Sequence, residues 1–133
     1  MHKDKKQLVK DILDEHIKPI FILVFGSYAK GNANENSDLD IAYYSDRALS
    51  SYDRFLLASE LSEKCHVEVD LIDIRQIDTV FAAQIFSTGE LLYCNDNNLF
   101  VRERMKAYSM YATLNEQRAE ILQGIKERGS IYG

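Results

Sequence analysis

The residues between positions 26 and 40 combine types and a spacing that suit phosphate and metal chemistry. Gly26 and Ser27 directly follow an apolar run, and Asp38 and Asp40 open the next one. Gly26 has no Cβ, so its backbone can approach a ligand closely, and Ser27 opens a short helix whose free N–H groups attract phosphate. Asp38 and Asp40 stand two apart on a predicted strand, so their carboxylates point to the same side and can share a divalent cation.

A third carboxylate is available on a later predicted strand. Within residues 67–72, Glu68 and Asp70 alternate with apolar residues, so the two acids share one face of that strand. Mg²⁺ prefers a few carboxylates together with phosphate oxygens and water. Asp70 is therefore predicted to complete a metal site with the first two aspartates, suited to in-line displacement at phosphorus, and Glu68 is the reserve candidate.

Neither motif is specific by itself. Gly-Ser after a strand is a common turn, and Asp-x-Asp is often only the polar end of a strand. Together with a third acidic strand they indicate a functional site. Three acids on one sheet face raise one another's pKa values and cost stability unless a cation neutralises them.

Hydrophobic patterning indicates the elements that position these residues. The segment 20–25, IFILVF, is a β-branched and aromatic run between a proline and a glycine, which predicts a strand buried on both faces in the middle of a sheet. Ser50 or Ser51 and Asp78 are expected helix N-caps. Helices are expected over residues 3–16, 27–30, 51–64, 78–87 and 98–128, and further strands over 39–44, 67–72 and 91–93.

Length and composition fit one compact domain. The 133 residues, 46% hydrophobic and 28% charged, suffice for a single core, so we expect one domain over residues 1–133. The net charge of −5 disfavours binding to nucleic acid backbones. No apolar stretch approaches the roughly 20 residues of a membrane span, and the charged N-terminus does not resemble a signal peptide, so we expect a cytoplasmic protein.

The two cysteines, Cys65 and Cys94, lie far apart in the sequence and outside any C-x-x-C pattern. We therefore expect reduced, structural thiols. His66 adjoins Cys65, but neighbours on an extended strand point to opposite faces and chelate poorly, so a zinc site is not expected.

The spacing of Gly-Ser, ten residues and Asp-x-Asp followed by an apolar residue resembles the polymerase β nucleotidyltransferase superfamily, and the short chain resembles its minimal nucleotidyltransferases. The order of this motif, the strand EVDLIDI, the segment FSTGELLY and a long C-terminal helix ending ERGSIYG resembles the MntA antitoxins, which pair with HEPN-domain toxins. The resemblance covers nearly the whole chain. It implies an α/β (α+β) fold of the polymerase β type, with a small mixed sheet flanked by helices and a long C-terminal helix.

The resemblance also implies an activity. Enzymes of this kind transfer AMP from ATP to a tyrosine of the partner HEPN ribonuclease and so neutralise it. The residues implied for triphosphate binding are Gly26, Ser27 and Lys30, and those implied for Mg²⁺ are Asp38, Asp40 and Asp70. Asp70 would in addition help to deprotonate the attacking hydroxyl.

Two other functions stay open from the sequence. A binding module that neutralises the toxin by occlusion fits the small size, the acidic charge and the long helix. A nucleotidyltransferase acting on a small molecule such as an antibiotic fits the motif, although enzymes of that kind usually carry an additional helical domain. Tyr132, near the C-terminus, is a conceivable self-modification site, but we interpret it as a surface residue.

Overall fold

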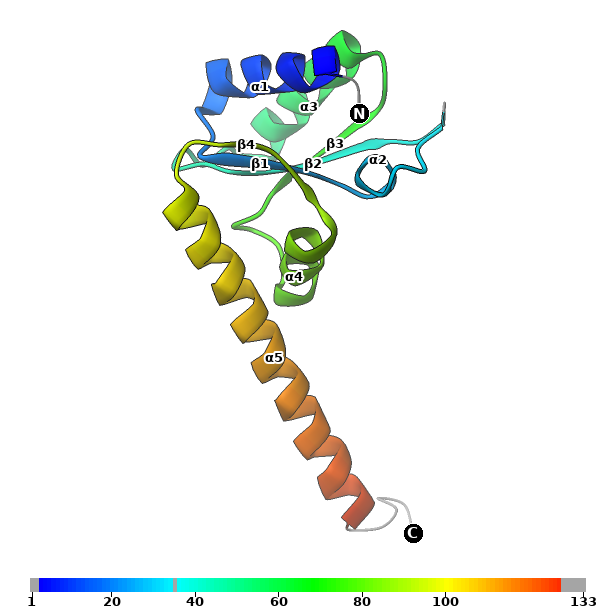
Figure 1. The fold of residues 1–133 in the computed structure, drawn as a ribbon, viewed down its shortest axis with the longest axis vertical. Helices are drawn as coiled ribbons and strands as arrows, with labels where there is room; N and C mark the ends of the chain where they lie inside the picture. Colours follow the sequence, from blue (N-terminus) through cyan, green and yellow to red (C-terminus); the bar gives the residue numbers. More distant parts are fainter. Residues whose placement is uncertain (1–2, 35, 128–133) are drawn as a thin grey trace.

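The computed structural model describes residues 3–34 and 36–127, which form a small sheet with helices on both faces (Figure 1). The helices are α1 (Lys3–Ile17), α2 (Ser27–Lys30), α3 (Ser51–Cys65), α4 (Thr79–Thr88) and α5 (Asn97–Glu127). The strands are β1 (Phe21–Phe25), β2 (Leu39–Tyr44), β3 (Val69–Asp73) and β4 (Glu90–Cys94). No helix in this described part is long and apolar enough to cross a membrane.

The sheet has the strand order β3-β2-β1-β4. Strand β1 runs antiparallel to both of its neighbours, whereas β2 and β3 are parallel and are connected through α3. The sheet is therefore mixed, as the resemblance implied. Residues Phe21 to Val24 of β1 are buried, which confirms the predicted central strand.

Two apolar cores lie on opposite faces of the sheet. One joins the sheet to α1 and α3, and the other joins it to α4 and α5. Side chains of β2 alternate between them, so that Ile41 and Tyr43 enter the first core and Ala42 and Tyr44 the second. By the same alternation Asp40 lies on the face that α4 and α5 cover.

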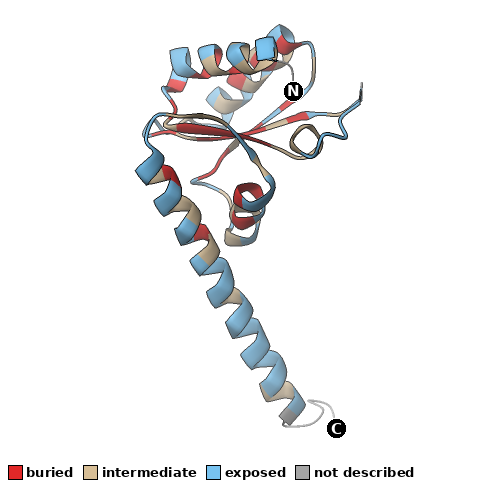
Figure 2. Ribbon diagram, in the orientation of Figure 1, coloured by how far each residue is buried: buried red, intermediate tan, exposed pale blue. Residues whose placement is uncertain are grey.

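Helix α5 is anchored near its start and then leaves the body of the protein. The Phe100 ring lies 5.0 Å from that of Phe21 and 5.7 Å from that of Phe86, measured between centroids. Phe100 and Ala107 are buried, but no described residue of α5 beyond Ala107 is, and the helix projects into solvent (Figures 1 and 2). The predicted end of this helix at residue 128, and Tyr132, lie outside the described residues.

Helix caps stand where the sequence predicted them. The Ser50 side chain accepts a hydrogen bond from the Asp53 amide at 3.0 Å, and Asp78 accepts one from the Phe81 amide at 2.8 Å. Each bond satisfies one of the amides that the first turn of a helix leaves unpaired.

The passage from α3 to β3 differs from the prediction. Cys65 ends α3, and His66 takes a left-handed conformation (φ 56°) with its amide bonded to the Ser62 carbonyl, so β3 begins at Val69 rather than at residue 67. The expectation that Cys65 and His66 are neighbours on a strand is therefore wrong. Both Cys65 and Cys94 are free thiols, as predicted.

Candidate active site

The register of the sheet brings the predicted site residues together at one end of β2. Asp40 pairs with Phe25 of β1 on one side and with Asp70 of β3 on the other. Gly26 directly follows Phe25, so the glycine lies next to Asp40 as well. Gly26 and Asp70, 14 and 30 positions away from Asp40 in the sequence, thereby meet it at one end of the sheet.

Gly26 is in close contact with Asp40. Its backbone has φ 69° and ψ −147°, a conformation that residues with a Cβ rarely adopt. A Cβ built at this position would overlap Oδ2 of Asp40. Glycine is therefore required here for two reasons, the backbone conformation and the space that the carboxylate occupies.

The charges of Asp70 and Asp38 act on Asp40. The pKa of Asp40 is raised above its ordinary value, first by burial, then by the negative charge of Asp70, and then by that of Asp38. Asp70 is exposed, and Asp38 is exposed and stands just before the first residue of β2. Repulsion among like charges at one site is the condition that a bound cation would relieve.

The carboxylates do not form a closed metal cage. Among the described residues, no three His, Cys, Asp or Glu side chains are grouped so that they would hold a metal ion by themselves. Mg²⁺ is commonly bound through one or two carboxylates, with water and substrate phosphate completing its coordination. The donor set at Asp40 fits Mg²⁺ on these terms, as an ion shared between the protein and a triphosphate.

Helix α2 follows Gly26 and begins at Ser27. Its N-cap residue is Gly26, which has no side chain to cap the first turn, and the first amides of a helix have no partner within the helix itself. Ser27 is half-buried, while Lys30 is exposed at the last position of α2, one turn away. Gly31 ends the helix in a left-handed conformation with φ 75°.

Glu68 lies beside Asp70 but before the start of β3. It is exposed, and its carbonyl accepts a hydrogen bond from the Leu39 amide at 2.8 Å, which fixes the start of the β2–β3 ladder. Glu68 and Asp70 both line a cavity of about 520 Å³ between α3 and β3. This cavity was not predicted, because it depends on how α3 packs beside the sheet edge.

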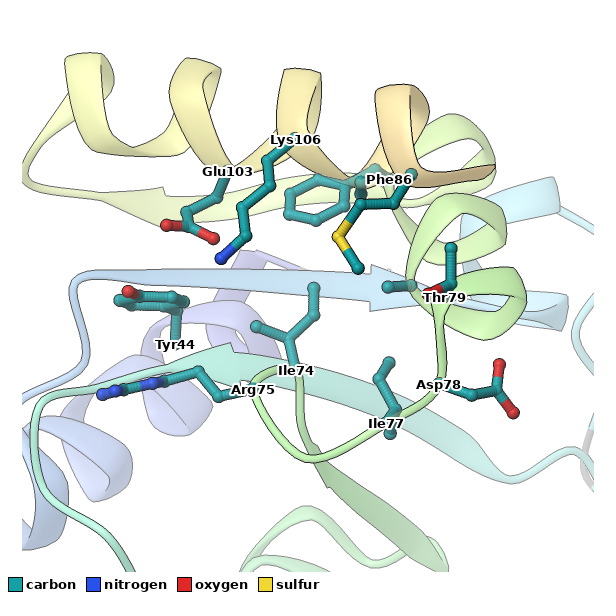
Figure 3. A pocket seen from close by; sticks show the side chains of 12 residues that line it. Tyr44, Ile74, Arg75, Ile77, Asp78, Thr79, Phe86, Glu103 and Lys106 are labelled. Atoms are coloured by element: carbon teal, nitrogen blue, oxygen red, sulfur yellow. The ribbon is translucent and has the colours of Figure 1, made fainter. Parts of the chain in front are cut away.

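A second cavity, of about 370 Å³, lies on the face of the sheet that α4 and α5 cover (Figure 3). Arg75 stacks over the Tyr44 ring at 5.3 Å and donates to the Ser45 carbonyl at 3.1 Å, while Glu103 and Lys106 reach in from α5 (Figure 3). Tyr44 is at the opposite end of β2 from Asp40. None of the predicted catalytic carboxylates lines this cavity.

Comparisons with known proteins agree with this geometry. The model of the family described as polymerase beta nucleotidyltransferase matches residues 7–98, which include Gly26, Asp40 and Asp70. The chain belongs to this nucleotidyltransferase family. It is 32% identical over 124 residues to the protein adenylyltransferase MntA of Shewanella oneidensis, covering 92% of this chain and 87% of that one.

Solved structures show the same fold over nearly the full length. A crystal structure of a toxin–antitoxin with AMP-PNP matches with a TM-score of 0.79 at 30% identity, covering 94% of this chain and 99% of the other. A complex of the tri-AMPylated Shewanella oneidensis HEPN toxin with its MNT antitoxin matches with a TM-score of 0.78 at 28% identity, covering 95% and 99%. The chain is thus a homologue of the MntA adenylyltransferase with the nucleotidyltransferase fold.

Proposed function

We propose that this chain is an antitoxin that neutralises a HEPN-domain ribonuclease by transferring AMP from ATP to one of its tyrosines. The observation that carries the proposal is the contact of Gly26 with Asp40, flanked in the sheet by Asp70. It combines a backbone shaped for close approach with carboxylates that repel one another until a cation binds. The similarity to a protein adenylyltransferase supports the nature of the transferred group.

In the proposed reaction, Gly26 and Ser27 bind the triphosphate through backbone amides and the Ser27 hydroxyl, with Lys30 as a further phosphate contact. Mg²⁺, held by Asp38, Asp40 and Asp70 with phosphate oxygens, would supply positive charge to the triphosphate and to the departing pyrophosphate. The ATP requirement fits a reaction in the cytoplasm.

The transfer is a substitution at the α-phosphorus of ATP. The tyrosine oxygen forms a bond to this phosphorus, and the bond from the phosphorus to the bridging oxygen breaks, so that the electron pair leaves with pyrophosphate. The phenolic proton passes to the Asp70 carboxylate, which acts as the general base. The products are AMP-tyrosine and pyrophosphate.

Intact mass spectrometry of the cognate toxin tests the proposal directly. After incubation with this chain, ATP and Mg²⁺, the toxin should gain mass in whole AMP units, and the number of units gives the number of groups transferred. The variant carrying both Asp38→Asn and Asp40→Asn should leave the mass of the toxin unchanged. An unmodified toxin after incubation with the wild-type chain contradicts the proposal.

The exposed distal half of α5 favours a second function, neutralisation by binding alone. Ile121 and Leu122, adjacent on this part of the helix, are 61% and 67% exposed, and neighbouring exposed apolar residues are suited to contact with a partner. In cells, the double asparagine variant separates the two functions. If it protects against the toxin as well as wild type, occlusion is sufficient and AMP transfer is secondary.

A further inference from the structure

A groove runs between α3 and the free edge of β3, and it is the 520 Å³ cavity described above. Within the described part of the chain, β3 is the outermost strand on this side, next to β2. The wall formed by α3 consists mainly of small side chains at helical spacing, which leave the groove open: Ser51, Ala58, Ser59 and Ser62. Phe55 stands on the rim of the groove and is 66% exposed.

The backbone of β3 presents hydrogen-bonding groups to this groove. The Leu39 amide donates to the Glu68 carbonyl, and the Ile74 amide donates to the Tyr43 carbonyl. The backbone N–H and C=O groups of the even-numbered residues in this segment therefore point toward β2. In a parallel ladder the intervening residues then direct their N–H and C=O groups to the opposite edge. These residues are Val69, Leu71 and Asp73, and all three line the groove.

One of the outward amides already has a partner. The Val69 amide donates to the Ser62 hydroxyl at 2.9 Å. Further along β3, the amides of Leu71 and Asp73 have no strand beside them in the described part of the chain. The Asp73 carbonyl, in contrast, already accepts from the Gln76 amide at 3.0 Å. A free strand edge of this kind is a template for an added strand from another chain.

The order of the strands places ATP and the acceptor protein on different sides of Asp40. Gly26 and Ser27 follow β1, Asp40 lies on β2, and Asp70 lies on β3, so the aspartate of β2 stands between the triphosphate side and the groove. In-line displacement at phosphorus requires the acceptor oxygen to approach opposite the departing pyrophosphate. With the triphosphate on the β1 side, the acceptor approaches from the β3 side, where Asp70 lines the groove.

The charges along the groove favour a basic occupant. The exposed carboxylates of Glu68 and Asp70 line it, whereas Asp73 is buried and its Oδ1 already accepts from the Arg75 amide at 2.9 Å. Among the described residues, the guanidinium in this lining is that of Arg54. Arg54 is engaged at the far end of the groove, where it donates to Oε1 of Gln76 at 3.1 Å. A segment that carries Lys or Arg beside its acceptor residue is complementary to this lining.

We propose that this groove binds the acceptor segment of the protein substrate as an extended strand added to β3, with the tyrosine hydroxyl delivered to Asp70. The inference rests on the function proposed above. Backbone bonds to Leu71 and to the Asp73 amide hold the segment, and the acidic lining selects basic residues next to the tyrosine. The covalent step is the substitution already described, in which the phenolic proton passes to Asp70 and pyrophosphate leaves.

Ser59→Trp tests the groove without altering the residues assigned to catalysis. Ser59 is exposed on the groove wall, so an indole there fills the space of the added strand. Lys64→Trp, on another side of α3 and outside the groove lining, is the matched control. We expect Ser59→Trp to raise the KM for the cognate HEPN toxin at least tenfold, with unchanged affinity for α,β-methylene-ATP, and Lys64→Trp to change neither.

Amide exchange in the wild-type chain gives an independent readout. In a complex with the toxin and α,β-methylene-ATP, the Leu71 and Asp73 amides should become at least tenfold more protected. The Val69 amide, already bonded to Ser62, should change little. A toxin complex without added protection at Leu71, or a Ser59→Trp variant that labels the toxin like wild type, overturns the groove assignment while the proposed function stands. A wild-type chain that never labels the toxin overturns the proposed function itself.

Discussion

The backbone of Gly26 lies so close to the carboxylate of Asp40 that a Cβ at position 26 would overlap Oδ2. The strand–helix turn and the central carboxylate therefore form one structural unit. A change at either residue displaces the other.

Gly26→Ala should abolish most activity. The methyl group must push the Asp40 carboxylate aside, and the backbone conformation costs about 1–3 kcal/mol for a residue with a Cβ. We expect the rate of AMP transfer to fall at least tenfold. The free energy of unfolding should fall by the cost of the backbone strain, about 1–3 kcal/mol. Single-turnover labelling and urea unfolding measure the two effects.

Gly31→Ala is the matched control for that change. Gly31 also has a positive φ, of 75°, but a Cβ there meets nothing within 4 Å. Its cost is backbone strain alone, about 1–2 kcal/mol of stability, with AMP transfer close to wild type. Equal loss of activity in both variants would mean that the overlap with Asp40 is not what matters.

Asp40→Asn should be at least as stable as wild type at pH 7 in EDTA. The folded-state pKa of Asp40 is raised above 3.8 by burial and by Asp70 and Asp38. The favourable contribution of Asp40 to the free energy of unfolding is therefore complete below about pH 3.8, and it is lost as the pH rises through the folded-state pKa. Asparagine carries no charge and does not lose this contribution.

Urea unfolding of the wild type and of Asp40→Asn, at pH 7 and near pH 3.5, shows which of the two is more stable at each pH. The advantage of the asparagine variant should be present at pH 7 and absent in acid. Addition of Mg²⁺ and α,β-methylene-ATP at pH 7 should reverse the order, because only the aspartate binds the cation. A variant that is less stable than wild type in EDTA at pH 7 would contradict the expected repulsion.

Nucleotide and metal should stabilise the chain only together. At 100 times its dissociation constant, a ligand adds about 2.7 kcal/mol, which corresponds to a rise in Tm of about 10 °C for a domain of this size. We expect this rise with Mg²⁺ plus α,β-methylene-ATP and a much smaller one with either component alone. The Asp38→Asn and Asp40→Asn double variant should show none, and a full rise with nucleotide in EDTA would exclude a role for the metal in binding.

Tyr43→Phe should leave stability unchanged or raise it. The Tyr43 hydroxyl is buried and makes no hydrogen bond of good geometry among the described residues. Arg54 lies close enough to act on its pKa, but the guanidinium donates its hydrogen bond to Oε1 of Gln76 at 3.1 Å. An unpaired buried hydroxyl costs about 1–3 kcal/mol, so its removal should not reduce the free energy of unfolding. Thermal unfolding measures this, with Tyr43→Leu as a control that should be destabilised by the loss of the ring.

Removal of residues 113–133 should spare the fold and weaken toxin binding. The buried anchors of α5, Phe100 and Ala107, stay in the shortened chain, and no described residue that is removed is buried. We expect a change of less than about 1 kcal/mol in the free energy of unfolding. Calorimetric titration with the toxin gives the second readout, and full affinity in the shortened chain would exclude the distal helix from the interface.

The sequence by itself determined the elements and the local chemistry. Alternation along β2 and the spacing of Asp38 and Asp40 are short-range properties, and so are the caps at Ser50 and Asp78, because they depend on residues a few positions apart. Such patterns also predicted that β1 is central, since a run with no polar face must be covered on both sides. The left-handed turn at His66 was missed, because nothing in the local sequence required it.

The tertiary structure decided which of these residues meet. The parallel pairing of β2 with β3 sets Asp70 beside Asp40, and the antiparallel pairing of β1 with β2 sets Gly26 against it. Both registers follow from burying the two faces of the sheet at once, a condition on the whole chain rather than on any segment. The groove at the edge of β3 depends on the same packing, because its two walls come from elements that the sequence describes only separately.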